Sequence, residues 1–227
     1  TCDASACPAG FTCVTTVSPA VCIPSDQLSA TPDVGAKALA PSTAREGVDV
    51  RLEFTATKAL GKDPVVRLGL TPPRLFVKDA AASTGNAYVY RYAPQGDEPQ
   101  GQDFPVTADL QDVQGLVSTG RALGQVRFDF AAPAALAPAL TGSPARFPGT
   151  IRVTFTASED LSTDPAVKIG GVPMAKDPAG TSGRAYAFTY AATGTEAEDP
   201  AGLPITAELV DGGGNVAALT LPPRAVF

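Results

Sequence analysis

The sequence predicts an all-β protein in which two tandem β-sandwich domains follow a small disulfide-linked segment at the N-terminus. Three observations carry this prediction. The same strand-like segments recur at a spacing of about 100 residues, apolar and polar residues alternate within them, and all the cysteines lie in the first 22 residues. A period near 100 residues is the size of a whole domain rather than of a solenoid repeat. We therefore expect a cysteine-rich module at 1–28 and sandwich domains at 36–130 and 136–227.

The N-terminal segment contains all four cysteines, Cys2, Cys7, Cys13 and Cys22. An even number of cysteines in a stretch too short for a hydrophobic core indicates two disulfides. A zinc site is the first alternative, but the gaps of four, five and eight residues differ from the usual C-x2-C pairs. A lipid-anchored Cys2 is the second, and Thr1 ahead of it argues against that. Residues 29–37 are expected to be a polar tether.

The clearest strand of each copy follows a short segment that proline interrupts. In copy one the apolar residues at 48, 50, 52, 54 and 56 alternate with polar ones, and in copy two those at 151, 153, 155 and 157 do the same. A period of two with one polar face predicts a half-buried antiparallel strand. The preceding segments, 38–45 and 139–146, are expected to be edge strands, which tolerate proline.

Further strands follow in the same order in both copies. Asp63-Pro64 and Asp164-Pro165 turn the chain into the next short strand, and Gly- or Asn-containing turns precede the last one. The remaining predicted strands are 66–68, 88–92, 104–110 and one within 117–130, and then 167–169, 186–190, 203–209 and one within 216–227. About seven short strands per copy predict an immunoglobulin-like sandwich. Residues 131–135 join the copies.

The chain lacks the residues of common catalytic sites. It contains no His, which excludes Ser-His-Asp triads and Cys-His pairs. It also has no G-x-S-x-G elbow, P-loop or dinucleotide-binding glycine motif after a strand. Glu159-Asp160 and Glu196 with Glu198 are the candidate carboxylate pairs for glycoside hydrolysis, but their loops differ between the copies. We therefore expect no enzyme activity, no catalytic residues, no cofactor and no metal.

Two binding alternatives remain open. Acidic loops at the end of a sandwich can supply oxygen ligands for calcium. The acids expected to share one end are Asp97, Asp103 and Asp112 in copy one and Glu196, Glu198, Asp199 and Asp211 in copy two. The aromatic stripes Tyr88-Tyr90-Tyr92 and Tyr186-Phe188-Tyr190 are the candidate platform for sugar stacking. Inward packing, with the hydroxyl groups at the sandwich rim, is the favoured interpretation.

Charge and composition bear on the partners and the compartment. The net charge is −6 and the pI is about 4.6, which argues against nucleic acids and anionic membranes as partners. No stretch approaches about 18 continuous apolar residues, so no transmembrane segment is expected. No signal peptide is visible, so a secreted protein would be present here in processed form. The disulfides predict an extracellular or cell-surface location.

Copy two carries a family resemblance. Its run G-x-I-x-V-x-F-T-A-S-E-x-L-x-x-x-P-x-V begins at Gly149, and a D-x-x-G-N turn begins at Asp211. These residues resemble the bacterial Ig-like repeats of secreted and surface proteins, which are common in large extracellular proteins of myxobacteria. The resemblance covers about residues 38–227 and implies spacer, display or adhesive roles. Copy one departs from the pattern, with Leu116 in place of Asn215 and Lys58-Ala59 in place of Glu159-Asp160.

The cysteine module carries a second resemblance. The run from Cys7 to Cys13 is similar to the C-x-x-G-[FY]-x-C corner of EGF-like modules. This resemblance implies the pairing Cys2–Cys13 and Cys7–Cys22, one of three that four cysteines allow. With four cysteines rather than six, the module is expected to be a truncated relative.

Taken together, these features predict a non-enzymatic structural or adhesive protein of the bacterial cell surface. Its tandem domains are expected to form a short rod within a larger assembly. The expected partner is a protein, either another copy of this chain or a different surface protein. A carbohydrate-binding accessory module of a secreted enzyme is the alternative, which leaves a glycan as a second possible partner. That alternative calls for exposed aromatic residues, preferably Trp, and the chain contains no Trp.

Overall fold

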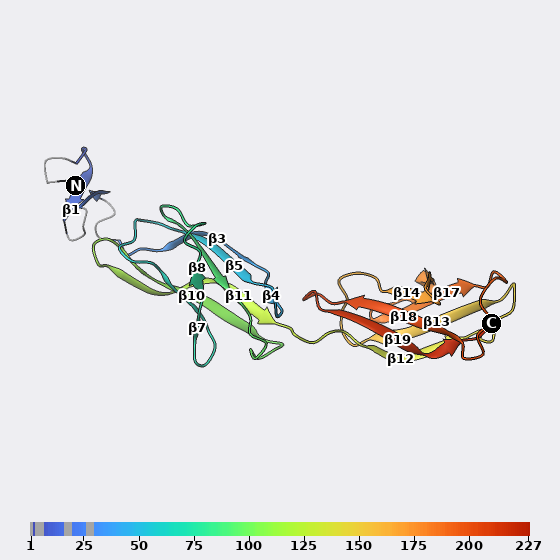
Figure 1. Ribbon diagram of the computed structural model, residues 1–227. Coiled ribbons are helices and arrows are strands. Elements are labelled where there is room, and N and C mark those ends of the chain that lie inside the picture. The colour runs from blue at the N-terminus through green and yellow to red at the C-terminus, as the bar shows by residue number, and fades with distance from the viewer. Residues whose placement is uncertain (1, 3–6, 16–19, 26–29) are drawn as a thin grey trace. The chain divides into compact units, whose positions relative to one another are not determined.

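The structure is a computed structural model that describes residues 2, 7–15, 20–25 and 30–227. It is all-β, as the sequence predicts, and divides into two compact units, Thr1–Asp129 and Phe130–Phe227. The first unit holds the cysteine module and one sandwich, which we call sandwich 1 (34–128). The second unit is sandwich 2 (135–227) with the residues that lead into it (Figure 1).

The cysteine module is a two-stranded antiparallel sheet. Strand β1 (Phe11–Val14) pairs with β2 (Val21–Pro24), and Cys13 lies opposite Cys22. Disulfides join Cys2 to Cys13 and Cys7 to Cys22, so the predicted pairing is confirmed. All four sulfur atoms are committed, which leaves no thiolate for zinc and no Cys2 thiol for a lipid. Thr1 lies outside the described residues.

Sandwich 1 has the strand arrangement of an immunoglobulin domain. One sheet has the order β3-β5-β9-β8 and the other the order β4-β11-β10-β6-β7. The rings of Tyr92 and Phe128, which belong to different sheets, lie 6.1 Å apart, so the sheets pack face to face. The strands are β3 (Val34–Ala40), β4 (Thr43–Ala44), β5 (Val50–Ala56), β6 (Val65–Leu68), β7 (Arg74–Leu75), β8 (Val77–Lys78), β9 (Ala87–Tyr92), β10 (Asp103–Gln111) and β11 (Val117–Phe128).

Sandwich 2 repeats this arrangement. Its sheets have the orders β12-β13-β17-β16 and β15-β14-β18-β19. One hydrophobic cluster joins residues of both sheets, among them Phe155 and Leu209. The strands are β12 (Ala135–Thr141), β13 (Thr150–Ala157), β14 (Ala166–Ile169), β15 (Val172–Pro173), β16 (Ala175–Lys176), β17 (Ala185–Ala191), β18 (Leu203–Val210) and β19 (Val216–Ala225).

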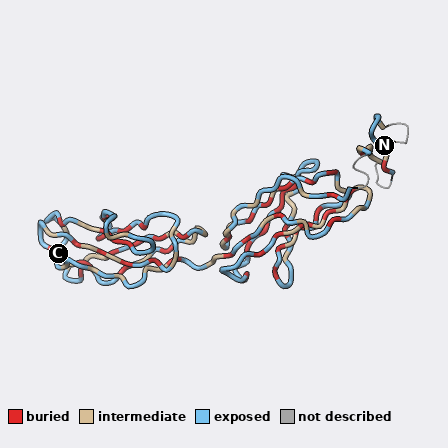
Figure 2. The backbone as a smooth tube through the Cα atoms, turned by 180° about the vertical axis from the view of Figure 1, so that it is seen from behind, coloured by how far each residue is buried: buried red, intermediate tan, exposed pale blue. Residues whose placement is uncertain are grey.

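The alternating strands lie where the sequence predicts, with the apolar face buried. In β5 the side chains of Val50, Leu52 and Phe54 are buried, and those of β13 follow the same pattern. Buried and exposed positions alternate along these strands (Figure 2). Val48 was predicted to belong to this strand but does not. It lies in the turn before the strand begins, where its N–H donates to the Arg45 carbonyl.

Two predicted boundaries are wrong by a few residues. Residues 34–37 belong to β3 rather than to a tether, because Val34 pairs with Ala56 and Lys37 with Phe54. Ala135 likewise belongs to β12, where it pairs with Ala157. As predicted, β3 and β12 are edge strands.

Candidate functional site

The two ends of each sandwich are the candidate functional sites, because the chain enters at one and leaves at the other. In sandwich 2 the entering segment is fixed by two bonds: Ser158 N–H donates to the Ala134 carbonyl, and Ala134 N–H donates to Ser158 Oγ, both at 2.9 Å. Ser158 directly follows β13. The leaving segment is hydrogen-bonded to residues that precede β13 in the chain: Ala145 N–H donates to the Val226 carbonyl at 2.9 Å. We call these the entry end and the exit end.

Sandwich 1 is built the same way. At its entry end Asp33 N–H donates to Thr57 Oγ1, and Thr57 N–H donates to the Asp33 carbonyl, both at 2.9 Å. At its exit end Asp129 N–H donates to the Ala44 carbonyl at 3.0 Å. The segment that precedes each sandwich is thus hydrogen-bonded to that sandwich before the first strand pairs.

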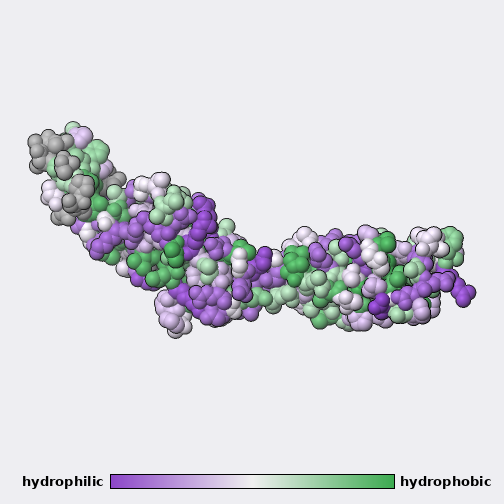
Figure 3. Space-filling model, viewed as in Figure 1, coloured by the Kyte–Doolittle hydropathy of each residue, from purple (hydrophilic) through white to green (hydrophobic). Residues whose placement is uncertain are grey.

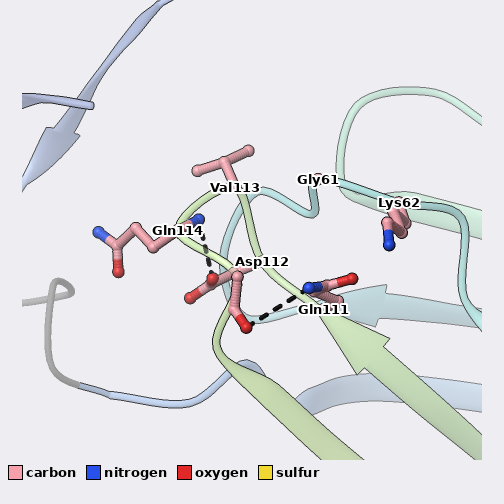
Figure 4. Close-up of a pocket in the computed structure, with 7 residues that line it drawn as sticks. Gly61, Lys62, Gln111, Asp112, Val113 and Gln114 are labelled. Carbon is pink, nitrogen blue, oxygen red and sulfur yellow. Dashed lines mark hydrogen bonds between the residues drawn. The ribbon is translucent and has the colours of Figure 1, made fainter. Parts of the chain in front are cut away.

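A buried ion pair holds the entry end of sandwich 1. The Lys58 ammonium lies 2.7 Å from Asp112 Oδ2, with the two side chains only 3% and 0% exposed. It also donates to the Ala30 carbonyl at 2.7 Å, which ties the entering segment to the turn after β10. The other carboxylate oxygen, Oδ1, accepts from the N–H groups of Gln114 and Leu116. Figure 4 shows the Asp112 carboxylate turned back towards the main chain of Gln114.

The entry end of sandwich 2 has an acid where sandwich 1 has this lysine. Glu159 takes the place of Lys58, and Asp211, which is fully buried, takes the place of Asp112. A carboxylate oxygen of Glu159 lies within 4.8 Å of one of Asp211. Asn215 donates to both Asp211 oxygens, through its main-chain N–H and through Nδ2, each at 2.8 Å. The sequence alignment shows this exchange of charge, but not that the positions are buried.

The exit end of sandwich 1 is braced by Glu98, whose side chain is fully buried. Its carboxylate accepts from the Tyr92 hydroxyl, from Arg74 at 2.8 Å and from the N–H groups of Gln95 and Gly96 at 3.0 Å. Burial raises the pKa of Glu98, but the bonds from Tyr92 and Gln95 outweigh it, so the pKa lies below its ordinary value. The sequence analysis did not single out Glu98.

Glu196 holds the loop at the exit end of sandwich 2 in the same way. Its carboxylate accepts from Thr193 N–H at 2.6 Å, from Gly194 N–H at 2.9 Å and from the Tyr190 hydroxyl at 2.9 Å. The bond from the Thr193 main chain is the largest cause that lowers the pKa of Glu196 to about 2. A Tyr at the last or last-but-one position of the strand and a Glu six residues after that Tyr are the shared sequence signal.

The acids considered for calcium do not share one end. The loop with Glu196 follows β17, whose Ala191 pairs with Thr150 at the start of β13. Asp211 pairs with Leu161, beyond the other end of β13. The expected gathering of these acids is therefore wrong. Three of the other candidates have partners of their own: Asp97 with Arg74, Asp103 with Arg127, and Asp199 with the N–H of Ala201.

Five of the six side chains in the aromatic stripes are buried, as the favoured interpretation predicts, and Tyr190 is partly buried. Tyr88 is 7% exposed and stacks on Phe54, and Tyr90 donates from its hydroxyl to the Pro64 carbonyl at 2.6 Å. In sandwich 2, Phe155 stacks on Tyr186 in the same way. Rings in these positions do not offer a flat exposed face to a sugar.

An exposed aromatic residue does occur at the exit end of sandwich 2. Phe147 is 68% exposed and lines a pocket of about 460 Å³. Arg146, Glu196 and Glu198 line the same pocket. The arrangement joins an apolar ring to hydrogen-bonding carboxylates. The sequence analysis missed it because a lone Phe in a loop carries no periodic signal.

Searches with this sequence against protein-family models and curated proteins find no match. Within the described part of the chain, no helix is both long enough and apolar enough to cross a membrane. The two disulfides are compatible with an extracellular protein. The functional argument therefore depends on the geometry of the two sandwiches.

Proposed function

We propose that this chain is a non-enzymatic, extracellular structural or adhesive protein that acts as a short rod within a cell-surface assembly. The observation that carries the proposal is the opposite placement of the entry and exit ends in each sandwich. A domain that receives the chain at one end and releases it at the other extends a tandem array. Hydrogen bonds to the entering segments reduce the freedom of each junction further.

The chemistry of the side chains supports a non-enzymatic role. The chain has no His to act as a base, and its cysteines are committed to disulfides. Buried Glu98 and Asp112 accept hydrogen bonds from loop main chain or hold a lysine. Acids with such partners stabilise loops and are poorly placed for proton transfer.

The edge strands support the proposal that the partner is a protein, which can be a second copy of this chain. β3 and β12 each pair on one side only, and edge strands of this kind are where a partner can add a strand. On the visible face, hydrophobic residues form small areas separated by hydrophilic ones (Figure 3). Pairing through main-chain groups suits such a surface better than a broad apolar contact does.

The resemblance to bacterial Ig-like repeats agrees with this proposal. The second sandwich carries its motif, with Phe155 in the core and the Asp211–Asn215 turn closed by hydrogen bonds. Repeats of this kind serve as spacers or adhesive units. The EGF-like corner of the cysteine module is also an extracellular element.

Carbohydrate binding is the second candidate function, and Phe147 is the observation that favours it. An exposed ring beside carboxylates can stack on a sugar while the acids accept its hydroxyl groups. The aligned residue of sandwich 1 is Glu46, so this feature belongs to sandwich 2 alone.

A glycan array combined with native mass spectrometry distinguishes the two functions. The proteins compared are the wild type, Phe147→Ala and the control Val216→Ala, which removes another exposed apolar residue. A structural protein is expected to give no glycan signal that depends on Phe147, and species above the 23.0 kDa monomer. A glycan signal lost in Phe147→Ala and kept in Val216→Ala would instead establish the accessory-module function.

A further inference from the structure

At one side of each sandwich the chain crosses from one sheet to the other. In sandwich 1 the crossing segment is 74–78, which contains β7 and β8, and in sandwich 2 it is 172–176, which contains β15 and β16. The middle residue is buried in both, Phe76 at 5% exposed and Met174 at 8%. The two segments align without a gap, with Leu75 at the place of Pro173 and Val77 at the place of Ala175.

The main-chain groups of Leu75 face the outer side of β7. Leu75 lies opposite Arg67 of β6, and the next residue, Phe76, donates its N–H to the Val66 carbonyl at 3.0 Å. Main-chain groups of successive residues in a strand point to opposite sides, so the N–H and the carbonyl of Leu75 point away from β6. β7 is the last strand of its sheet, and among the described residues no strand pairs with this outer side. An added strand could donate to and accept from Leu75.

Sandwich 2 has a proline at this position. Pro173 lies opposite Lys168, and Met174 N–H donates to the Val167 carbonyl at 2.9 Å, which repeats the geometry of β7. Proline has no main-chain N–H, so β15 offers an acceptor here without the donor. Proline on an edge strand is one of the ways in which proteins prevent strand addition. The comparison therefore favours strand addition at sandwich 1.

The side chains next to these groups are apolar and exposed. Leu75 is 58% exposed and Val77 is 71% exposed. Pro73, two residues before Leu75, is also exposed. Residues two apart in an extended segment lie on the same face, so these three form a short apolar stripe along the edge.

The charges of this edge permit contact with an identical edge. The two basic residues that flank the stripe each have an acidic partner in their own chain. Arg74 lies 2.7 Å from Asp97, and Lys78 forms an ion pair with Asp63. Two copies of the edge therefore meet without an uncompensated like charge, which would otherwise oppose their association.

We propose that β7 of sandwich 1 pairs in antiparallel fashion with β7 of a second copy of this chain, about a two-fold axis at Leu75. In this pairing each Leu75 N–H donates to the Leu75 carbonyl of the other copy, so one contact satisfies all four groups. Val77 of each copy lies opposite Pro73 of the other, and the two Leu75 side chains face each other. The apolar stripe of one copy thus covers that of the other.

This inference rests on the proposed function, for which it names one contact surface and makes the partner a second copy. The contact is small, so we expect a weak dimer with a Kd on the order of 10–100 µM. Weak pairing suits an assembly in which many copies are held close together, because several such contacts then act at once.

Sedimentation velocity of the full chain over a range of concentrations tests the pairing. The wild type should show a species of twice 23.0 kDa. Leu75→Pro, which copies sandwich 2, should raise the Kd about tenfold or more, because two hydrogen bonds are lost. Val172→Ala, which removes an exposed apolar side chain from β15, is the matched control and should keep the Kd of the wild type.

A second variant guards against an effect of proline on the fold. Leu75→Asp keeps the N–H but places two like charges opposite each other, so it should also raise the Kd about tenfold or more. Both variants should melt near the temperature of the wild type, because the side chain of Leu75 is exposed.

The pairing is overturned if the wild type stays monomeric up to about 1 mM. It is also overturned if both Leu75 variants dimerise with the Kd of the wild type, since another surface would then hold the dimer. The frictional ratio of the monomer separates this result from the proposed function. An elongated monomer that does not pair would leave the rod standing, whereas a compact monomer would contradict the rod itself.

Discussion

At the scale of single residues, Phe54 and Phe155 occupy equivalent core positions on the second long strand of each sandwich. They are 2% and 3% exposed, and each stacks on two rings of the neighbouring strand. Truncation of either to Ala should cost roughly 3–5 kcal/mol of unfolding free energy. Denaturant unfolding should show the loss mainly in the sandwich that carries the change. A loss below about 1 kcal/mol would contradict the burial of the ring.

The buried pair Lys58–Asp112 makes a second prediction at this scale. Lys58→Met keeps the length of the side chain but leaves Asp112 buried without its cation, which should destabilise sandwich 1 by about 3–5 kcal/mol. Lys62→Met, an exposed lysine of the same loop, is the matched control and should change little. Chemical denaturation measures both. Equal effects of the two substitutions would mean that the pair contributes nothing specific.

Glu196 predicts a pH dependence. Its pKa is about 2 in the folded protein, against an ordinary value of 4.5, mainly because Thr193 N–H donates to it. A carboxyl group with a lowered pKa stabilises the fold fully above its unfolded pKa, and the contribution is lost as the pH falls towards the folded pKa. Glu196→Gln should therefore reduce the fall in the melting temperature between about pH 5 and pH 2.5. Glu208→Gln should behave like the wild type, and an unchanged pH profile in Glu196→Gln would refute the assignment.

At the scale of elements, the cysteine module is stabilised by its disulfides and the sandwiches by their cores. Among the described residues of the module, β1 pairs with β2, and the two disulfides tie those strands to Cys2 and Cys7. Its reduction should therefore leave the melting transitions of both sandwiches nearly unchanged. Calorimetry with and without a reductant measures this. A drop of several degrees in either transition would show that the module supports that sandwich.

The long strands could be predicted from the sequence because their apolar residues recur at every second position, as Val50, Leu52 and Phe54 do. It did not predict β7, β8, β15 or β16, which have two residues each and carry no period. The alignment of Lys58 with Glu159 was visible. The burial of Lys58 could not be predicted from the alignment, because it depends on how the turn after β10 folds back on the loop after β5. The roles of Glu98 and Glu196 in holding their loops were missed for the same reason, because they depend on how the loops fold.

At the scale of the whole molecule, one architecture occurs twice with different chemistry at its ends. The strand order and the entry and exit bonds are shared, whereas the entry-end charges and the exposed Phe147 differ. Shared strands with divergent ends are typical of tandem domains that keep a common structural role and specialise at their junctions. This pattern agrees with the proposed rod, which is based on the opposite placement of the entry and exit ends in each sandwich.

Small-angle X-ray scattering of the full chain tests the central claim most directly. Two sandwiches in series, with strands of about 8–10 residues plus loops, should span roughly 70–90 Å. The radius of gyration of such a rod is about 25 Å, whereas a compact globule of this length would have about 17 Å. The account predicts the larger value and an elongated distance distribution. A value near 17 Å with a symmetric distribution would contradict it.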